Sequence, residues 1–138
     1  YGLAALRIGW CYTSEKVANI INKIKPPFNT TAISQSIAIK ALEDKEYIDD
    51  IVKLNFDIKR WFESKLKLLN IKVRSTEGNF SLIESSNETI NKIYNHLIND
   101  GIITRQLNSY DLSNFLRISI GTKEEMEETI KSLQSFNE

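Results

Sequence analysis

The chain has 138 residues, of which 41% are hydrophobic and 26% charged, and 18 basic residues balance 18 acidic ones to a formal net charge of zero. A neutral chain has no general attraction for nucleic acid or for an anionic membrane. A single cysteine and a single histidine exclude an internal disulfide and a Cys/His zinc cage, and no apolar run approaches the roughly 20 residues of a membrane span. We therefore expect a soluble cytoplasmic protein without a metal, nucleic-acid or membrane partner.

The first segment alternates bulky and small residues. Leu6, Ile8, Trp10 and Tyr12 occupy one set of positions, and Arg7 falls in the other set. This period of two predicts a strand over residues 6–13, with Cys11 as a buried and inert thiol on it. Because the chain starts at Tyr1 and enters this ordered pattern at once, we expect it to be a piece of a longer protein.

Helical patterns follow. Ser14 is a suitable N-cap for a helix to about Ile24, and Thr30 or Thr31 for a second one. A third apolar stripe runs from Glu46 to Leu69, which corresponds to a helix of about 35 Å at ~1.5 Å per residue. A helix of this length in a small protein commonly joins two lobes, so we expect the boundary between them inside it.

The second half has a different pattern, in which strands alternate with helices. Strands are predicted at 71–74, 80–84, 102–107 and 115–121, one helix begins with Asn87 as its cap and ends at Gly101, and a last helix opens at Thr122 and runs to about Phe136. This order describes a ββαββα lobe, and the fold class is α+β.

Three arginines are the main candidates for function. Arg7, Arg105 and Arg117 each lie in or at the end of a predicted strand. The alternation of apolar residues around Arg117 puts its side chain on the opposite face from them. A guanidinium on a rigid strand can hold a carboxylate or a phosphate through two hydrogen bonds. Pattern alone favours three solvent-facing charges over one anion site, and it leaves both open.

The remaining polar candidates are weaker. His96 has no nucleophile or carboxylate pairing evident nearby, so we interpret it as a solvated residue on a helix face. Asn79 is either a turn residue or a donor aimed at a carboxylate. Tyr110 lies in a polar loop, where it can cover a cleft or pack on it. The acidic run that follows Thr122 suits the first turn of a helix and is interpreted as a solvated face.

Several segments together resemble the C-terminal part of histidinol-phosphate aminotransferase, a fold-type I enzyme that uses pyridoxal phosphate. They are Gly2-Leu3-Ala4-Ala5-Leu6-Arg7-Ile8-Gly9-Trp10, Lys25-Pro26-Pro27-Phe28-Asn29 with Gln35, Gly78-Asn79-Phe80, Gly101-Ile102-Ile103-Thr104-Arg105 and Leu116-Arg117-Ile118-Ser119-Ile120-Gly121-Thr122. They occur in the order found in that family and span nearly the whole chain.

The resemblance implies a role for each candidate. Arg7 matches the arginine that binds the cofactor phosphate. Arg117 matches the arginine that receives the carboxylate of the amino donor or the phosphate of histidinol phosphate, and Arg105 matches a second arginine at the phosphate end. Asn79 matches a position near the substrate anion. No residue of this sequence matches the lysine that forms the Schiff base, since that position falls just before Tyr1.

The resemblance also implies an organisation and a reaction. Residues 1–45 would be the end of the large cofactor-binding domain, and residues 46–138 the linking helix and the small domain of a homodimer. The parent enzyme would exchange an amino group between histidinol phosphate and 2-oxoglutarate in histidine biosynthesis, while the isolated chain would be inactive without the lysine. Alternatives are a related aromatic aminotransferase, a phosphothreonine decarboxylase, or a non-catalytic α+β remnant that binds a partner.

Overall fold

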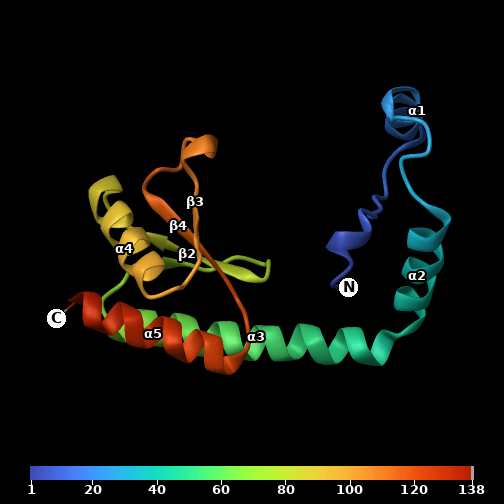
Figure 1. Ribbon diagram of the computed structural model, residues 1–138. Coiled ribbons are helices and arrows are strands. Elements are labelled where there is room, and N and C mark those ends of the chain that lie inside the picture. Colours follow the sequence, from blue (N-terminus) through green and yellow to red (C-terminus); the bar gives the residue numbers. More distant parts are fainter. Residues whose placement is uncertain (138) are drawn as a thin grey trace. The chain divides into compact units, whose positions relative to one another are not determined.

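A computed structural model describes residues 1–137. The chain divides into two compact units, and the boundary falls between Asp50 and Ile51. Along the chain the elements are η1 (Ala4–Leu6), α1 (Glu15–Ile24), α2 (Ala32–Glu43), α3 (Lys45–Leu68), β1 (Val73–Arg74), β2 (Phe80–Glu84), α4 (Asn87–Asn99), β3 (Arg105–Gln106), η2 (Asn108–Tyr110), β4 (Phe115–Ser119) and α5 (Lys123–Asn137) (Figure 1). The prediction of an α+β fold is confirmed.

The first unit consists of η1, α1 and α2 with irregular segments between them. Thr31 caps α2, because its hydroxyl oxygen accepts a hydrogen bond of 3.0 Å from the backbone N–H of Ser34. The Ser34 hydroxyl in turn donates to the Leu6 carbonyl at 2.8 Å, which ties η1 to α2. Ser34 is also the one residue of the described first unit that is buried. A polar bridge, and not an apolar core, thus connects η1 to α2.

The strand predicted over residues 6–13 is wrong. Residues 4–6 form a short 3-10 helix, Arg7 ends it in a left-handed conformation at φ 52°, and no regular element occurs from residue 8 to residue 14. A strand exists only where its backbone pairs with another strand, and within the described chain the sheet pairs β1, β2, β4 and β3 alone. The burial predicted for Cys11 is wrong for the same reason, since its thiol is exposed.

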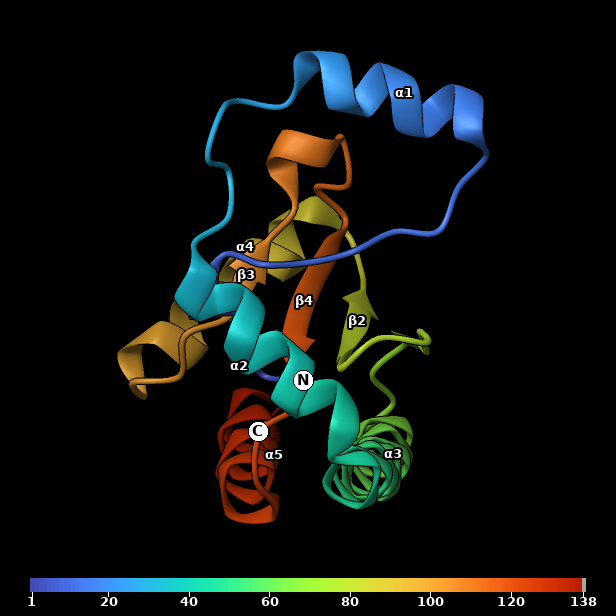
Figure 2. The ribbon, with the colours of Figure 1, turned by 90° about the vertical axis from the view of Figure 1, so that its right-hand side faces the viewer.

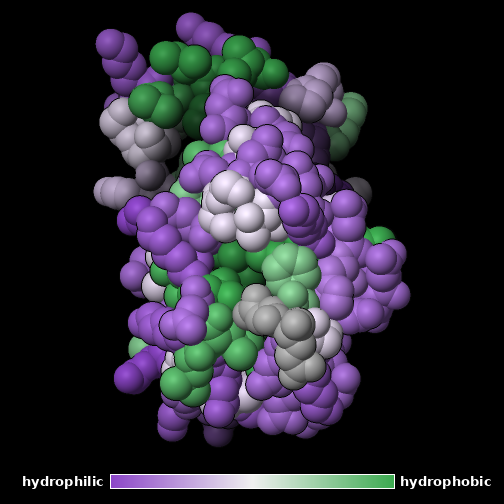
Figure 3. Space-filling model, turned by 90° about the vertical axis from the view of Figure 1, so that its left-hand side faces the viewer, coloured by the Kyte–Doolittle hydropathy of each residue, from purple (hydrophilic) through white to green (hydrophobic). Residues whose placement is uncertain are grey.

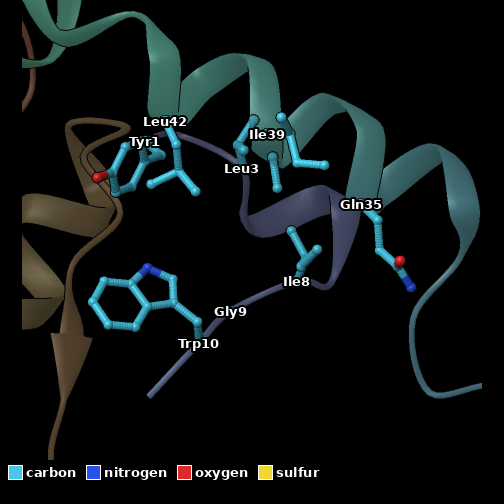
Figure 4. A pocket seen from close by; sticks show the side chains of 9 residues that line it. Tyr1, Leu3, Ile8, Gly9, Trp10, Gln35, Ile39 and Leu42 are labelled. Atoms are coloured by element: carbon cyan, nitrogen blue, oxygen red, sulfur yellow. The ribbon is translucent and has the colours of Figure 1, made fainter. Parts of the chain in front are cut away.

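The first unit contains an open apolar groove of about 360 Å³. Figure 4 shows Ile8 and Trp10, from the segment after η1, on one side of it, and Ile39 and Leu42 of α2 on the other. Trp10 remains 75% exposed. The groove is therefore an uncovered surface and not an enclosed cavity.

The second unit is built on a four-stranded antiparallel sheet in the order β1-β2-β4-β3. In the central pair, Ser81 lies opposite Ile118 and Ile83 lies opposite Leu116. All four side chains are buried, so this set defines the inner face of the sheet. The intervening residues of β2 and β4 point to the other face, because side chains alternate along a strand.

Helices α3, α4 and α5 supply the rest of the core. The fully buried side chains include Phe62 and Leu66 of α3, Leu97 of α4, and Met126 and Leu133 of α5, in one cluster with the inner face of the sheet. Figure 2 shows α3 and α5 end-on and side by side, below β2 and β4. On the face drawn in Figure 3, hydrophilic residues cover most of the surface and hydrophobic ones show between them.

The ends of the elements refine the predictions. The N-cap of α4 is Ser86, one residue before the predicted Asn87, and its hydroxyl accepts from the N–H of Thr89 at 3.1 Å. The predicted capping box of α5 is confirmed: the Thr122 N–H donates to Glu125 Oε2 at 2.7 Å and the Glu125 N–H to Thr122 Oγ1 at 3.3 Å. β3 is shorter than predicted, because only Arg105 and Gln106 pair with β4.

Candidate anion-binding site

The outer face of the sheet carries the candidate site. On β4 the outward positions are Phe115, Arg117 and Ser119, which alternate with the buried Leu116 and Ile118. The opposite positions on β2 are Glu84, Leu82 and Phe80, in that order. None of these outward residues belongs to the core cluster. The outer face therefore combines aromatic rings, one carboxylate and a guanidinium.

Arg105 of β3 is the direct cross-strand partner of Arg117. Residues directly opposite each other in an antiparallel pair have Cα atoms about 4.5–5.5 Å apart and side chains on the same face. Two like charges in this arrangement repel each other and destabilise the sheet. An anion between them would remove that repulsion.

The Arg117 guanidinium is held by an aromatic ring. Its Cζ atom lies 4.3 Å from the centroid of the Phe80 ring, which is within the range of a cation–π interaction. The Nε atom of Arg117 is buried and has no hydrogen-bond partner in the described part of the chain. A buried donor without a hydrogen-bond partner is costly, so this position favours a ligand with acceptor oxygens.

Arg105 is more exposed than Arg117, and its guanidinium contacts a different aromatic ring, that of Tyr110. Its Nη2 atom donates to the Tyr110 hydroxyl at 3.1 Å, and its Cζ atom lies 5.6 Å from the centre of the same ring. Tyr110 belongs to η2, the short helix between β3 and β4. The loop aromatic noted in the sequence thus packs against one of the two arginines.

Glu84 is the carboxylate of this face, and it forms ion pairs with Lys72 and Arg74 instead of with Arg105 or Arg117. Lys72 Nζ lies 2.6 Å from Oε1, and Arg74 Nε lies 2.6 Å from Oε2. The hydrogen bond from Arg74, followed by that from Lys72, holds the pKa of the Glu84 carboxyl below its usual value. Among the described residues, no carboxylate forms an ion pair with Arg105 or Arg117, so Arg74 is neutralised and these two are not.

The other two candidates are placed as follows. Asn79 is exposed and immediately precedes β2, and its carbonyl accepts a hydrogen bond of 2.9 Å from the Ile120 N–H. This bond places the Asn79 backbone beside the end of β4, in the same sheet as Arg105 and Arg117. Arg7 belongs to the first unit, where its Nη1 atom donates to the Ala4 carbonyl at 3.2 Å.

His96 is half-buried rather than solvated, which corrects the interpretation from sequence. Its Nε2 atom lies 2.8 Å from the Ser132 carbonyl oxygen, an acceptor that requires this nitrogen to carry a proton. The Ser132 hydroxyl donates to Asp100 at 2.6 Å. The His96 ring lies 3.2 Å from the Ser135 hydroxyl as well, and together these contacts join α4 to α5.

Two structural features of this region were not predicted from the sequence. Lys59 of α3 is 7% exposed, and its ammonium donates to the carbonyls of Thr76 and Gly78. Phe80 was considered only as part of a motif and not as a partner of Arg117. The available signal was the spacing of Lys59, which precedes Phe62 by three residues and therefore lies one helical turn from it on the predicted helix.

No cluster of residues suited to a metal occurs within residues 1–137, and no helix there is long and apolar enough to cross a membrane.

The second unit is thus an antiparallel α+β domain with an unneutralised arginine pair on its open face. Comparison with known proteins identifies its family. The model for aminotransferases of class I and II matches residues 1–133. The chain therefore belongs to the class I and II aminotransferase family.

The relatives are longer than this chain. It is 40% identical over 146 residues to histidinol-phosphate aminotransferase from Flavobacterium johnsoniae, covering 99% of this chain and 40% of that protein. It is 37% identical over 140 residues to the Zymomonas mobilis protein of the same name, at 99% and 38% coverage. The chain spans about two fifths of the length of these curated relatives.

A solved structure shows the same fold. The histidinol-phosphate aminotransferase from Sinorhizobium meliloti, in complex with pyridoxal-5'-phosphate, superposes with a TM-score of 0.87 at 24% identity, over 99% of this chain and 38% of that one. A putative histidinol-phosphate aminotransferase from Erwinia carotovora atroseptica gives a TM-score of 0.81 at 21% identity, over 96% and 38%. At these identities the likeness establishes the fold alone.

Proposed function

We propose that this chain supplies the substrate-anion site of a histidinol-phosphate-type aminotransferase, an enzyme that exchanges an amino group between histidinol phosphate and 2-oxoglutarate. The observation that carries the proposal is the cross-strand pair of Arg105 and Arg117, neither of which has a carboxylate partner in the described chain. The Nε atom of Arg117 is also a buried donor without a hydrogen-bond partner in the described chain. Such a pair suits a substrate phosphate or carboxylate.

Such an enzyme needs this pair to hold its substrate in position. An amino group is exchanged only while the reacting carbon is held in place, and an arginine fork fixes a planar carboxylate or a phosphate in one orientation. Arg117 takes the carboxylate or the phosphate, Arg105 adds the second cation at the phosphate end, and Asn79 borders the same anion. Tyr110 and Phe80 hold the two guanidinium groups in place through their rings.

Arg7 is assigned to the phosphate of the cofactor, pyridoxal phosphate. It fits this group in residue type and exposure, since its guanidinium is exposed and uses only Nη1 in its hydrogen bond to the Ala4 carbonyl. The bond from Ser34 to the carbonyl of Leu6 fixes the backbone just before it. When bound, pyridoxal phosphate supplies the carbon atom that takes up the amino group and acts as the electron sink of the exchange.

The proposal includes an organisation of the chain. Residues 1–45 are assigned to the end of a large cofactor-binding domain, and residues 46–138 to a linking helix and a small domain. No residue of the 138 matches the lysine that the family uses for covalent cofactor attachment. We expect the isolated chain, mixed with pyridoxal phosphate, histidinol phosphate and 2-oxoglutarate, to give no turnover above the free cofactor, and turnover above that level would contradict this assignment.

A first experiment tests the anion site directly. Inorganic phosphate is titrated into the 138-residue chain, and binding is followed by the guanidinium resonances of the arginines. Arg117→Ala should abolish saturable binding, and Arg105→Ala should weaken it. Arg74→Ala is the control. This substitution should leave the affinity for phosphate unchanged, because Arg74 already forms an ion pair with Glu84. Equal affinities in all four proteins would refute the proposed site.

A second experiment tests the reaction. The 138 residues replace the matching part of the Flavobacterium johnsoniae relative, and histidinol-phosphate transamination is measured in the hybrid. Arg117→Ala in the hybrid should lower kcat/KM by about a hundredfold, since hydrogen bonds to a charged group contribute about 1.5–3 kcal/mol each. A hybrid that folds, binds the cofactor and keeps its activity after this substitution would exclude Arg117 from substrate binding.

We also propose that the protein acts as a homodimer in the cytoplasm. The support is the first unit, where Trp10 is 75%, Tyr12 95% and Phe28 100% exposed. Large apolar side chains that a folded unit leaves exposed are candidates for a surface that another protein covers. Sedimentation of the chain over a hundredfold range of concentration should show dimer formation, and a monomer throughout would argue against it.

A further inference from the structure

The turn between β1 and β2 is anchored to α3 by a buried lysine. Lys59 is 7% exposed, and its ammonium donates to the Thr76 carbonyl and, at 3.1 Å, to the Gly78 carbonyl. Lysine is almost never buried without partners, because desolvating its charge is costly. Here both acceptors belong to the backbone of one turn, so the charge restrains the path of that turn.

Two further bonds close the same turn. The Thr76 hydroxyl donates to the Phe80 carbonyl at 2.6 Å, and one helical turn after Lys59 the carboxylate of Glu63 accepts from the Ser81 hydroxyl at 2.6 Å. Glu63 is 8% exposed and Ser81 is fully buried. The start of β2 is thereby attached to α3 through buried polar contacts on both sides of Phe80.

The Phe80 ring has little freedom in this setting. A Cβ added at Gly78 would lie 2.8 Å from the Phe80 Cε1 atom, so the ring rests against the glycine backbone. The same ring contacts the Arg117 guanidinium, whose Cζ atom is 4.3 Å from its centroid. A continuous series of contacts therefore runs from the Lys59 ammonium through the turn and the ring to the arginine.

We propose that Lys59 and Phe80 are positioning residues for the anion site: Lys59 holds the turn, and the ring that the turn presents holds the Arg117 guanidinium ready for an anion. The inference rests on the proposed function for the identity of the site. It adds that the affinity of Arg117 for an anion depends on a helix residue that never contacts the anion. An arginine ordered before binding loses less side-chain entropy when the anion arrives.

The test uses the nitrogen-15-labelled 138-residue chain with inorganic phosphate as the probe. Phe80→Leu should shift the Arg117 Nε–Hε resonance in the absence of phosphate, because the ring current is lost, and should weaken phosphate binding about two- to fivefold. Phe80→Tyr keeps the ring and should restore the affinity. Phe115→Leu removes another ring of the outer face, one that forms no cation–π contact with Arg117 among the described residues, and should change neither quantity.

Lys59 is tested by the same two measurements. Lys59→Met keeps the stem and removes the ammonium, and should reproduce both the resonance shift and the weaker binding, whereas Lys59→Arg keeps donors for the carbonyls and should restore them in part. Where Lys59→Met does not fold, Lys59→Gln takes its place. The amide signals of Leu133, in the core, report whether the second unit remains folded.

The outcomes separate the two proposals. Absence of phosphate binding in the unmodified chain refutes the anion site, while the ligand-free Arg117 resonance still decides whether Phe80 and Lys59 position it. An Arg117 resonance that is the same in Phe80→Leu, Lys59→Met and the unmodified chain overturns the positioning role, and so does equal phosphate affinity in Phe80→Leu and Phe115→Leu.

Discussion

Arg105 and Arg117 lie directly opposite each other across β3 and β4, and no carboxylate in the described chain neutralises either of them. Their repulsion should be measurable in a double-mutant cycle of Arg105→Gln and Arg117→Gln, with urea unfolding as the readout. Without phosphate, we expect an unfavourable coupling of about 0.2–1 kcal/mol.

The sign of that coupling should change with the ligand and its size with salt. Saturating phosphate should make the coupling favourable, because one anion then binds both cations. Sodium chloride at 1 M should reduce the coupling, since it screens exposed charges over a length of about 3 Å. A coupling of zero under all three conditions would show that the two guanidinium groups point apart.

Gly78→Ala should disturb the outer face through one methyl group. The new Cβ would lie 2.8 Å from Cε1 and 3.1 Å from Cδ1 of Phe80, so the ring has to move. We expect a loss of about 1–3 kcal/mol in the free energy of unfolding and a changed Arg117 Nε–Hε resonance. Gly9→Ala is the matched control, because nothing lies within 4 Å of its Cβ position; equal effects of the two would contradict this reading of Gly78.

Glu84→Gln should give a pH-dependent loss of stability. The pKa of the Glu84 carboxyl lies below its usual value of 4.5 in the folded protein, chiefly because Arg74 and then Lys72 donate to it. A depressed carboxyl pKa stabilises the fold fully above pH 4.5, and this contribution disappears as the pH falls through the folded-state pKa. The unmodified chain should therefore exceed Glu84→Gln in stability at pH 7, and the difference should shrink below pH 4.5.

Thermal unfolding at a series of pH values checks this expectation. Glu77→Gln is the comparison, since Glu77 is exposed and forms no ion pair among the residues described. A stability difference between Glu84→Gln and the unmodified chain that stays constant down to pH 2 would show that the pair with Arg74 does not form in solution.

Phe62→Ala and Phe56→Ala compare two phenylalanines on one helix. Phe62 is 0% exposed in the core and Phe56 is 53% exposed. We expect Phe62→Ala to cost about 3–5 kcal/mol in the free energy of unfolding, because it removes a buried ring and leaves a cavity. Phe56→Ala should cost under about 1 kcal/mol. Similar losses in urea unfolding would mean that α3 does not pack on the sheet through the Phe62 face.

The sequence predicted the elements of the second unit well, because their patterns are local. The apolar stripe of the third helix predicted Glu46 to Leu69, and the structure has α3 at Lys45–Leu68. Alternation around Arg117 correctly put its side chain on the face away from Leu116 and Ile118. The same reasoning failed for residues 6–13, since a strand depends on a paired neighbour and alternation does not supply one.

What sequence determined by itself is therefore the α+β class, the approximate position of each α-helix and the family resemblance, all of which depend on residue type and spacing. Tertiary structure alone decided which side chains meet. Sheet order made Arg105 the neighbour of Arg117, ion pairing with Glu84 set Arg74 apart from them, and the burial of Lys59 attached the turn before Phe80 to α3. These contacts join residues distant in the chain, and a periodic pattern records only which face a residue occupies and not what lies across from it.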